Sequence, residues 1–304
     1  MAVVRLNGGL GNQLFQVSLA ISISMTTNAR VGIDLDNYNY LDKRRNRKPE
    51  ILNFESEFFD FCNSSSRFIQ KTSGFWPERI LDKARQSRER LIRKTDTPFG
   101  LNPQIERNLI FDSKIDLSQN SYFIGNYITP QYWNPNIQSV LEEVRRLIWK
   151  NEEGNGEAAK DRLILHIRRG DYVTNPKARK FHGICTDDYY LESTSTLIEE
   201  FPNIKEIVIF SDDQAYAFRM ASLVKTHNRM VRVDESVDPI NTLKAMSFSK
   251  YFIGANSTFS WWSSALMRDR VSILPAQWFL DPDLQIAPND FFLGEVRASQ
   301  MSLG

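Results

Sequence analysis

The chain has 304 residues, 41% of them hydrophobic and 25% charged, which is typical of a globular protein large enough for two domains. Its net charge is +1, so its overall charge does not indicate nucleic-acid binding. Two cysteines exclude a disulfide framework and a cysteine-rich zinc cluster, and they fit a reducing compartment. We expect neither a transmembrane helix nor a signal peptide, because there is no run of about 18 apolar residues and no basic segment before an apolar one at the N-terminus.

The first stretch predicts a strand, a glycine-rich loop, a helix and a second strand. We place the strands at 2–6 and 30–34 and the helix at 14–26, which together make one βαβ unit. Glycines in the loop Asn7–Gln13 let the backbone approach a ligand, and the helix N-terminus behind them favours negative charge. As a dinucleotide fingerprint the loop is incomplete, because Leu14 stands where the third glycine belongs. A turn needed only for strand-to-helix packing is the alternative.

Two aspartates follow the second predicted strand. Asp34 stands where a dinucleotide-binding protein would hold a ribose. Asp34-Leu35-Asp36 also has the Asp-x-Asp form by which many sugar transferases hold a metal ion. A pattern this short is common by chance, so we expect no metal site.

Two basic segments come next. Residues 42–50 predict a solvated loop, with contact to acidic glycan or lipid headgroups as the alternative. Residues 77–94 predict a helix with one apolar stripe and basic side chains over its other faces. Such a helix packs on the core, or it rests on an anionic membrane surface.

An aromatic segment lies near the end of this half. A predicted strand at 121–127 is followed by Tyr132 and Trp133, and then by a helix at about 137–150. Clustered aromatic side chains stack on sugar rings, although such clusters are more often part of a core.

The second half alternates strands and helices after a polar linker. Residues 151–157 are polar and include two glycines, so we expect two α/β domains, 1–150 and 158–304. The predicted elements are strands at 163–167, 207–210, 231–233, 251–253 and 271–274 and helices near 187–200, 214–223, 239–248 and 258–268. This alternation favours a parallel, doubly wound sheet. The tail from Pro275 onward is expected to be loop.

Charged side chains follow the first strand of this half. Arg168, Arg169 and Asp171 come directly after an apolar run. In open α/β sheets ligands bind beyond the carboxyl ends of the strands, so two guanidiniums there suggest a diphosphate. A surface loop in which an arginine pairs with Asp171 is the alternative.

Hydroxyl and amide side chains follow two other strands. Ser211 and Asp212 could hydrogen-bond a nucleotide base or ribose, and they are equally good helix N-caps. Asn256, Ser257 and Thr258 stand at a predicted helix start, where backbone N–H groups favour a phosphate.

Several of these segments resemble one family. His166–Tyr172 resembles the His-x-Arg-Arg-Gly-Asp-Tyr motif of α-1,2-fucosyltransferases, glycosyltransferase family 11. Gly8–Gln16 is similar to the opening signature of that family, and Phe210–Asp213 and Asn256–Trp262 are similar to two later motifs. Gly125–Trp133 resembles a further segment in part. The resemblance covers the chain to about residue 268.

The resemblance implies the GT-B architecture, α/β with two Rossmann-like domains facing across a cleft. The N-terminal domain would mainly bind the acceptor and the C-terminal domain GDP-fucose. The enzyme would move L-fucose to the 2-hydroxyl of a galactose-type residue of a glycan, inverting the anomeric centre, with no metal and no cofactor besides the donor GDP-fucose. Animal and plant relatives usually carry an N-terminal membrane anchor, and we expect none in this sequence. We therefore expect a bacterial-type cytoplasmic enzyme, with peripheral contact at the inner membrane face as an alternative.

Residue chemistry and resemblance together give candidate site residues. The catalytic candidates are Arg169, Asp171 and Asn12. The donor-binding candidates are His166, Arg168, Arg169, Ser211, Asp212, Asn256, Ser257, Thr258 and Gly11. The acceptor-binding candidates are Asn12, Gln13, Asp36 and Tyr127.

Some roles stay open at this point. Asp171 and Asp36 are both candidates for the general base, Asp171 can instead lock Arg168, and a transfer without a base is a further alternative. His166 either hydrogen-bonds substrate or shapes the loop, and a satisfied buried histidine is the alternative. Two other functions also remain: a nucleotide-dependent oxidoreductase using the Gly8–Gly11 loop, and a non-catalytic sugar-binding protein.

Overall fold

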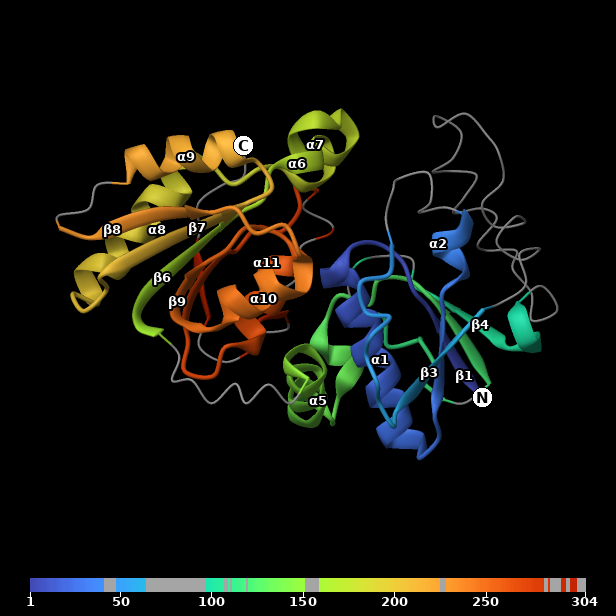
Figure 1. Cartoon of the computed structure of the whole chain (residues 1–304). Helices are drawn as coiled ribbons and strands as arrows, with labels where there is room; N and C mark the ends of the chain where they lie inside the picture. Colours follow the sequence, from blue (N-terminus) through green and yellow to red (C-terminus); the bar gives the residue numbers. More distant parts are fainter. Residues whose placement is uncertain are drawn as a thin grey trace. The chain divides into compact units, whose positions relative to one another are not determined.

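The computed structural model describes residues 1–40, 48–63, 97–106, 109, 111–118, 120–150, 159–224, 228–281, 284, 291–293 and 296–299. The predicted linker 151–157, the basic helix 77–94 and most of the basic loop 42–50 lie outside these ranges. The chain divides into two compact units, Met1–Ile148 and Trp149–Gly304, each built on its own parallel sheet (Figure 1). No described helix is long and apolar enough to cross a membrane.

The N-terminal unit has a five-stranded sheet in the order β3-β2-β1-β5-β4. Its strands are β1 (Ala2–Arg5), β2 (Val31–Asp34), β3 (Phe59–Cys62), β4 (Asn102–Ile105) and β5 (Ser121–Ile124), all paired in parallel. Its helices are α1 (Leu10–Thr27), the short α2 (Asp36–Tyr40) and α5 (Ile137–Trp149), with 3-10 turns η3 (Pro98–Gly100) and η4 (Pro130–Trp133). The chain runs from β1 outward to β3 and then fills the other side of β1, so the order of strands changes direction between β1 and β5.

Helix α1 begins four residues earlier than predicted. The carbonyl of Gly9 accepts the N–H groups of Asn12 (3.0 Å) and Gln13 (3.1 Å), which starts the helix at Leu10. The glycine-rich turn is therefore shorter than the sequence suggested, and residues 10–13 form the first helical turn instead of loop. Gly8 has φ +78°, a conformation that glycine adopts at little energetic cost.

The C-terminal unit has a six-stranded parallel sheet in the order β11-β10-β9-β6-β7-β8. Its strands are β6 (Ala159–Ile167), β7 (Glu206–Ser211), β8 (Met230–Asp234), β9 (Ser249–Ile253), β10 (Val271–Pro275) and β11 (Val296–Ser299). Its helices are α6 (Gly170–Thr174), α7 (Pro176–His182), α8 (Asp187–Glu200), α9 (Gln214–Leu223), α10 (Pro239–Ser247) and α11 (Thr258–Leu266). The predicted α/β class with two parallel sheets is thus confirmed.

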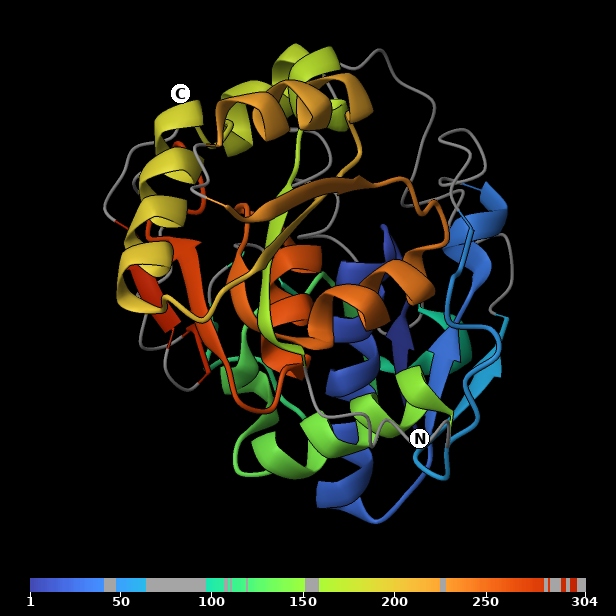
Figure 2. The same ribbon diagram turned by 60° about the vertical axis from the view of Figure 1, so that its left-hand side comes forward.

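Alternation along β6 explains why helices cover both faces of this sheet. Leu163, Leu165 and Ile167 pack into a core with side chains of α8 and α9, whereas Ile164 packs on the other face with Met246 of α10. Figure 2 shows α8 and α9 on one side of the strands and α10 and α11 on the other. A strand buried on both faces must be apolar at consecutive positions, as this one is.

The tail is not entirely loop, so that expectation was wrong for its end. Residues 296–299 form β11, which pairs in parallel with β10 at the edge of the sheet. The segment Val-Arg-Ala-Ser is short and half polar, as an edge strand can be. Because it contains no apolar run, the sequence pattern did not predict it as a strand.

Candidate active site

The three polar motifs of the C-terminal unit meet at one edge of its sheet. Strands β9, β6 and β7 are neighbours and parallel, so the segments that follow them start side by side. The chain fills β7 and β8 on one side of β6 and later β9, β10 and β11 on the other. The switch point therefore lies between β6 and β9, where open α/β sheets bind ligands.

Arg168 is bound by two carboxylates. Its guanidinium pairs with Asp171 and, at 2.5 Å, with Oδ2 of Asp212, and it lies 5.3 Å from the centre of the Tyr172 ring. The structure thus joins the motif after β6 to the motif after β7. The sequence left two roles open for Asp171, a general base or a partner that fixes Arg168, and this pairing is the second of them.

Asp212 also fixes the turn that carries both arginines. Its Oδ1 accepts the backbone N–H groups of Arg169 (2.8 Å) and Gly170 (3.1 Å). A Cβ atom at Gly170 would collide with Oδ2 of Asp212, which is paired with Arg168, so glycine permits this close approach. Ser211 has an internal partner as well, since its hydroxyl accepts the N–H of Asp213 at 3.0 Å.

Arg169 is held differently. Its Nε donates to Asp213 at 3.1 Å, and its guanidinium carbon lies 3.8 Å from the centre of the Tyr216 ring. No described residue accepts a hydrogen bond from its two terminal nitrogens, and its side chain is 22% exposed. The arginine is oriented through Nε and its flat face, while the nitrogens best suited to bidentate binding of an anion stay available.

Tyr216 belongs to a charged cluster that the sequence did not reveal. Its hydroxyl donates to Asp187, and Arg219, 4.8 Å from the same ring, also donates to Asp187 at 2.7 Å. Asp213 caps α9 by accepting the N–H of Tyr216 at 3.0 Å. The sequence shows that Asp213 and Tyr216 are spaced as an N-cap and a residue of the first helical turn. The contact of Tyr216 with Arg169, however, depends on the pairing of β6 with β7.

His166 is buried and links two motifs. Its Nδ1 lies 2.6 Å from Oγ of Ser260, which also accepts the N–H of Ala255 at 2.9 Å. Among the described residues the Ser260 hydroxyl has no other acceptor, so it donates its hydrogen bond to Nδ1. The neutral ring then carries its own proton on Nε2. Burial lowers the pKa of His166 to about 4, against the opposing effect of Asp212, and keeps the ring neutral at pH 7.

The start of α11 places its three predicted residues in different surroundings. Ser257 is the N-cap, its hydroxyl accepting the N–H of Phe259 at 3.2 Å, and Thr258 is the first helical residue. Asn256 is buried, and its amide donates to the carbonyls of His182 (2.7 Å) and Trp278 (3.2 Å). The amide of Asn256 therefore orders the loop here, and its predicted role as a diphosphate ligand stays a prediction.

The N-terminal unit gathers polar groups at its own switch point, between β1 and β5. The carbonyl of Gly125 accepts hydrogen bonds from Asn7 (3.3 Å) and Gln16 (2.8 Å), and Asn12 reaches Oδ1 of Asn126 at 3.5 Å. Asn12 is partly exposed in the first turn of α1, beside Gly11, which is buried there.

Three predicted acceptor residues are buried and bonded internally. Gln13 donates to the carbonyl of Gly8 at 3.1 Å and accepts the N–H of Glu50 at 2.8 Å. Tyr127 donates to the carbonyl of Gln104 at 2.8 Å. Asp36 is buried at the start of α2. Their described contacts support the loops around Asn12, and their predicted contact with an acceptor sugar stays a prediction.

Asp34 is unsuited to binding a ribose. It is fully buried, one oxygen accepting the Tyr122 hydroxyl at 2.5 Å and the other the N–H of Asp36 at 3.0 Å. Within the described ranges no group of three His, Cys, Asp or Glu side chains could hold a metal ion. The pair of aspartates is thus explained by packing at the end of β2.

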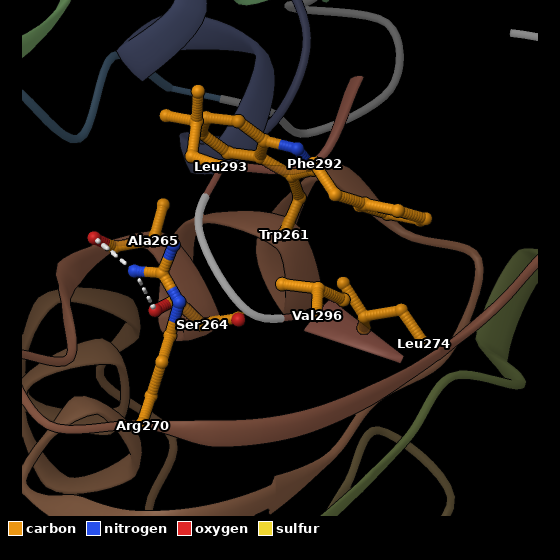
Figure 3. Close-up of a pocket in the computed structure, with 8 residues that line it drawn as sticks. All are labelled: Trp261, Ser264, Ala265, Arg270, Leu274, Phe292, Leu293 and Val296. Carbon is orange, nitrogen blue, oxygen red and sulfur yellow. Dashed lines mark hydrogen bonds between the residues drawn. The ribbon is translucent and has the colours of Figure 1, made fainter. Parts of the chain in front are cut away.

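A small pocket at the other end of α11 does not belong to this site. It lies beside Trp261, Ser264 and Ala265, and Figure 3 shows Arg270 reaching the carbonyls of Ser264 (3.1 Å) and Ala265 (3.2 Å) beside it. It has room for about one water molecule. Arg270 caps the helix C-terminus there, so the pocket needs no ligand to explain it.

Two doubly wound parallel sheets, each with polar groups gathered at its switch point, are the architecture of GT-B glycosyltransferases. The chain belongs to glycosyl transferase family 11, whose sequence model matches residues 1–295. It is 28% identical over 286 residues to an α-1,2-colitosyltransferase of Escherichia coli, covering 92% of each chain. It is also 28% identical over 302 residues to the O-antigen biosynthesis glycosyltransferase WbnK of Escherichia coli, covering 90% of this chain and 93% of that one.

Solved structures support the same fold at low sequence identity. A mutant of Arabidopsis thaliana FUT1 in complex with GDP matches with a TM-score of 0.50 and 11% identity, covering 87% of this chain and 68% of that one. The Escherichia coli heptosyltransferase WaaC with ADP-2-deoxy-2-fluoro heptose matches with a TM-score of 0.50 and 8% identity, covering 99% and 93%. Family membership confirms the resemblance seen in the motifs and makes the chain a glycosyltransferase, so the oxidoreductase and the non-catalytic binding protein are set aside.

Proposed function

We propose that this glycosyltransferase moves L-fucose from GDP-β-L-fucose to the 2-hydroxyl of a galactose-type residue of a glycan, with inversion and without a metal ion. The proposal is supported mainly by the setting of Arg169. Asp213 and Tyr216 orient its guanidinium, and its terminal nitrogens have no acceptor among the described residues. Such a group suits the diphosphate of a nucleotide sugar.

The chemistry follows from where charge develops. As the bond between fucose and GDP breaks, negative charge grows on the diphosphate. The guanidinium of Arg169 can bind the diphosphate through its two terminal nitrogens. The N-terminus of α11 at Ser257 and Thr258 supplies backbone N–H groups at the same sheet edge. Arg168, already bound to two carboxylates, keeps the turn in shape and adds positive charge when the donor displaces one of them. With these groups present, we assign no step to a metal ion.

We propose that the acceptor binds at the switch point of the N-terminal unit. Asn12 is the residue we expect to orient the acceptor hydroxyl, because it is partly exposed there while Gln13 and Asp36 are buried. Asp171 acts through Arg168, and Asp36 is buried, so we assign neither as general base. The weakly nucleophilic hydroxyl then attacks a sugar centre with oxocarbenium character as the bond from fucose to GDP breaks. Its proton passes to water or to an oxygen of the leaving diphosphate, so a strong base is not required.

A second donor is favoured by one specific observation. The relative of 28% identity over 92% of the chain is named a colitosyltransferase with the same α-1,2 linkage. Colitose is L-fucose without its 3-hydroxyl, so both sugars can use the same GDP site. Discrimination between them depends on whether a buried polar group bonds that hydroxyl, because a site built to bond a hydroxyl strongly disfavours the analogue that lacks it.

Competition between donors tests the proposal. Purified protein is given GDP-fucose, GDP-colitose and UDP-galactose with lactose as acceptor, and the products are analysed by mass spectrometry and linkage NMR. We expect an α-1,2-linked 6-deoxysugar from one of the GDP donors. Transfer from UDP-galactose only, or an unchanged lactose with all three donors while GDP fails to bind, would contradict the proposal.

We also propose that the enzyme acts in the cytoplasm on a glycan that is being assembled, as the name of the relative WbnK suggests for O-antigen. The candidate for peripheral contact with the inner membrane face remains the basic segment 77–94, which lies outside the described residues. A vesicle sedimentation assay with and without anionic lipid tests this contact.

A further inference from the structure

The turn Gly125–Tyr127, which follows β5, is tied to the start of the chain on one side. Its first carbonyl accepts hydrogen bonds from Asn7 and Gln16, and the Asn126 side chain accepts one from Asn12. The position of this turn therefore affects the position of the Asn12 side chain at the switch point.

Glu106 holds the same turn from the other side. It follows β4, and its Oε2 accepts the N–H groups of Asn126 (2.7 Å) and Tyr127 (2.9 Å). Tyr127 has φ +51°, which is costly for a tyrosine and persists only where the surroundings impose it. A Cβ atom at Gly125 would lie 2.5 Å from Cβ of Glu106, so the glycine permits the close approach of this carboxyl.

The second oxygen of the carboxyl is in an unusual position. Oε1 of Glu106 is buried and has no hydrogen-bond partner among the described residues. Burial raises the pKa of Glu106 to about 7, although the two backbone N–H groups act in the opposite direction. The carboxyl therefore changes its charge near neutral pH.

The two tyrosines beside Glu106 do not change charge in that range. Burial raises the pKa values of Tyr127 and Tyr132, so both hydroxyls stay neutral. The positive charge of Arg5 acts on Tyr127, and the backbone N–H of Asp112 donates to the Tyr132 hydroxyl. A pH dependence of this turn near neutrality thus belongs to Glu106.

We propose that Glu106 is a positioning residue for the acceptor sugar. As a carboxylate it accepts both N–H groups of the turn and keeps Asn126 in place beside Asn12. Protonation weakens that hold, because the new O–H group has no acceptor among the described residues. The inference rests on the proposed function, which places the acceptor beside Asn12.

The experiment compares Glu106→Gln, Glu106→Ala and the wild type, with Glu143→Gln as the matched control. Glu143 lies in α5 of the same unit, where it pairs with Arg146 and accepts a hydrogen bond from Ser56. Initial rates with GDP-fucose and lactose are measured between pH 5.5 and pH 8.5, and GDP binding is measured by calorimetry at both ends of the range.

For the wild type we expect the KM for lactose to rise about threefold or more as the pH falls through the ionisation of Glu106, with little change in kcat or in the Kd for GDP. Glu106→Gln keeps an acceptor oxygen and cannot ionise, so its KM should not vary with pH. Glu106→Ala should raise the KM about tenfold at every pH, since both N–H bonds are lost. Glu143→Gln should behave as the wild type.

A wild-type pH profile of KM in Glu106→Gln would overturn the inference. An equal loss of GDP binding and of lactose affinity in the Glu106 variants would also overturn it, because the carboxyl would then be a general support of the fold. If Glu106→Ala does not fold, the near-isosteric Gln variant still decides the question. Failure of the proposed function is distinguishable: the wild type itself would then neither bind GDP nor transfer fucose.

Discussion

The guanidinium of Arg169 lies over the ring of Tyr216, with 3.8 Å between the guanidinium carbon and the ring centre. Asp213 holds its Nε, and its two terminal nitrogens have no acceptor among the described residues. If the donor diphosphate binds Arg169 as proposed, Tyr216 helps to determine its position, because the planar fork of arginine binds a diphosphate through its terminal nitrogens.

Replacement of Tyr216 by leucine should therefore weaken GDP binding. We expect an increase of about 3- to 10-fold in Kd, the range for loss of a cation–π contact at a partly exposed site. Tyr216→Phe retains the ring and loses only the bond to Asp187, so its Kd should change less. Phe218→Ala, which alters an exposed side chain of the same helix, is the control for general damage to α9. Calorimetry that gives the leucine variant wild-type affinity would refute this role.

His166 should reduce the stability of the fold in mild acid. Its pKa in the folded chain is about 4, lowered mainly by burial from the ordinary value of 6.5. The unfolded chain takes up the proton first as the pH falls, so stability present above pH 6.5 is lost between pH 6.5 and pH 4, by at most about 3 kcal/mol. We expect the free energy of unfolding of His166→Asn to fall less over this window than that of the wild type, measured by urea titration. Parallel curves for the two proteins would show that the buried ring does not titrate as described.

Removal of divalent cations should leave the transfer rate unchanged. The Asp34-x-Asp36 pair is buried and engaged with Tyr122 and with its own backbone, and the proposed diphosphate ligands are arginines and backbone N–H groups. The measurement is the rate with GDP-fucose and lactose in excess EDTA, followed by addition of Mn²⁺ or Mg²⁺. A full loss that manganese restores would return Asp34 and Asp36 to the site as metal ligands.

Local sequence patterns predicted the elements better than the contacts of individual side chains. The apolar run before Arg168 and the spacing of 187–200 and 214–223 led directly to β6, α8 and α9. The polar motifs after β6, β7 and β9 also lie at one edge of the sheet as predicted, because parallel strands bring their carboxyl ends together. The binding roles of these residues stay predictions. Strand β11 was missed because a short edge strand has no apolar pattern.

The side chains that turned inward could not be recognised from the sequence. Asn256 and Gln13 are polar residues in motifs that suggest ligands, yet each satisfies buried backbone groups of a loop. Glu106 and Tyr216 lie outside the matched motif residues, and their importance comes from strand pairings that bring them to Asn126 and Arg169. Tertiary contacts of this kind have no signature in a single sequence.

We propose that the donor diphosphate binds at the turn that carries Arg168 and Arg169. Calorimetric titration with GDP-fucose in EDTA decides this for the wild type, Arg169→Ala and Arg168→Ala, with circular dichroism to show that each variant is folded. We predict binding in the micromolar range for the wild type, at least about a hundredfold weaker binding for Arg169→Ala, and a smaller loss for Arg168→Ala, whose guanidinium is shared with Asp171 and Asp212. Folded Arg169→Ala with wild-type affinity would contradict the account, and a larger loss in Arg168→Ala would reverse the roles of the two arginines.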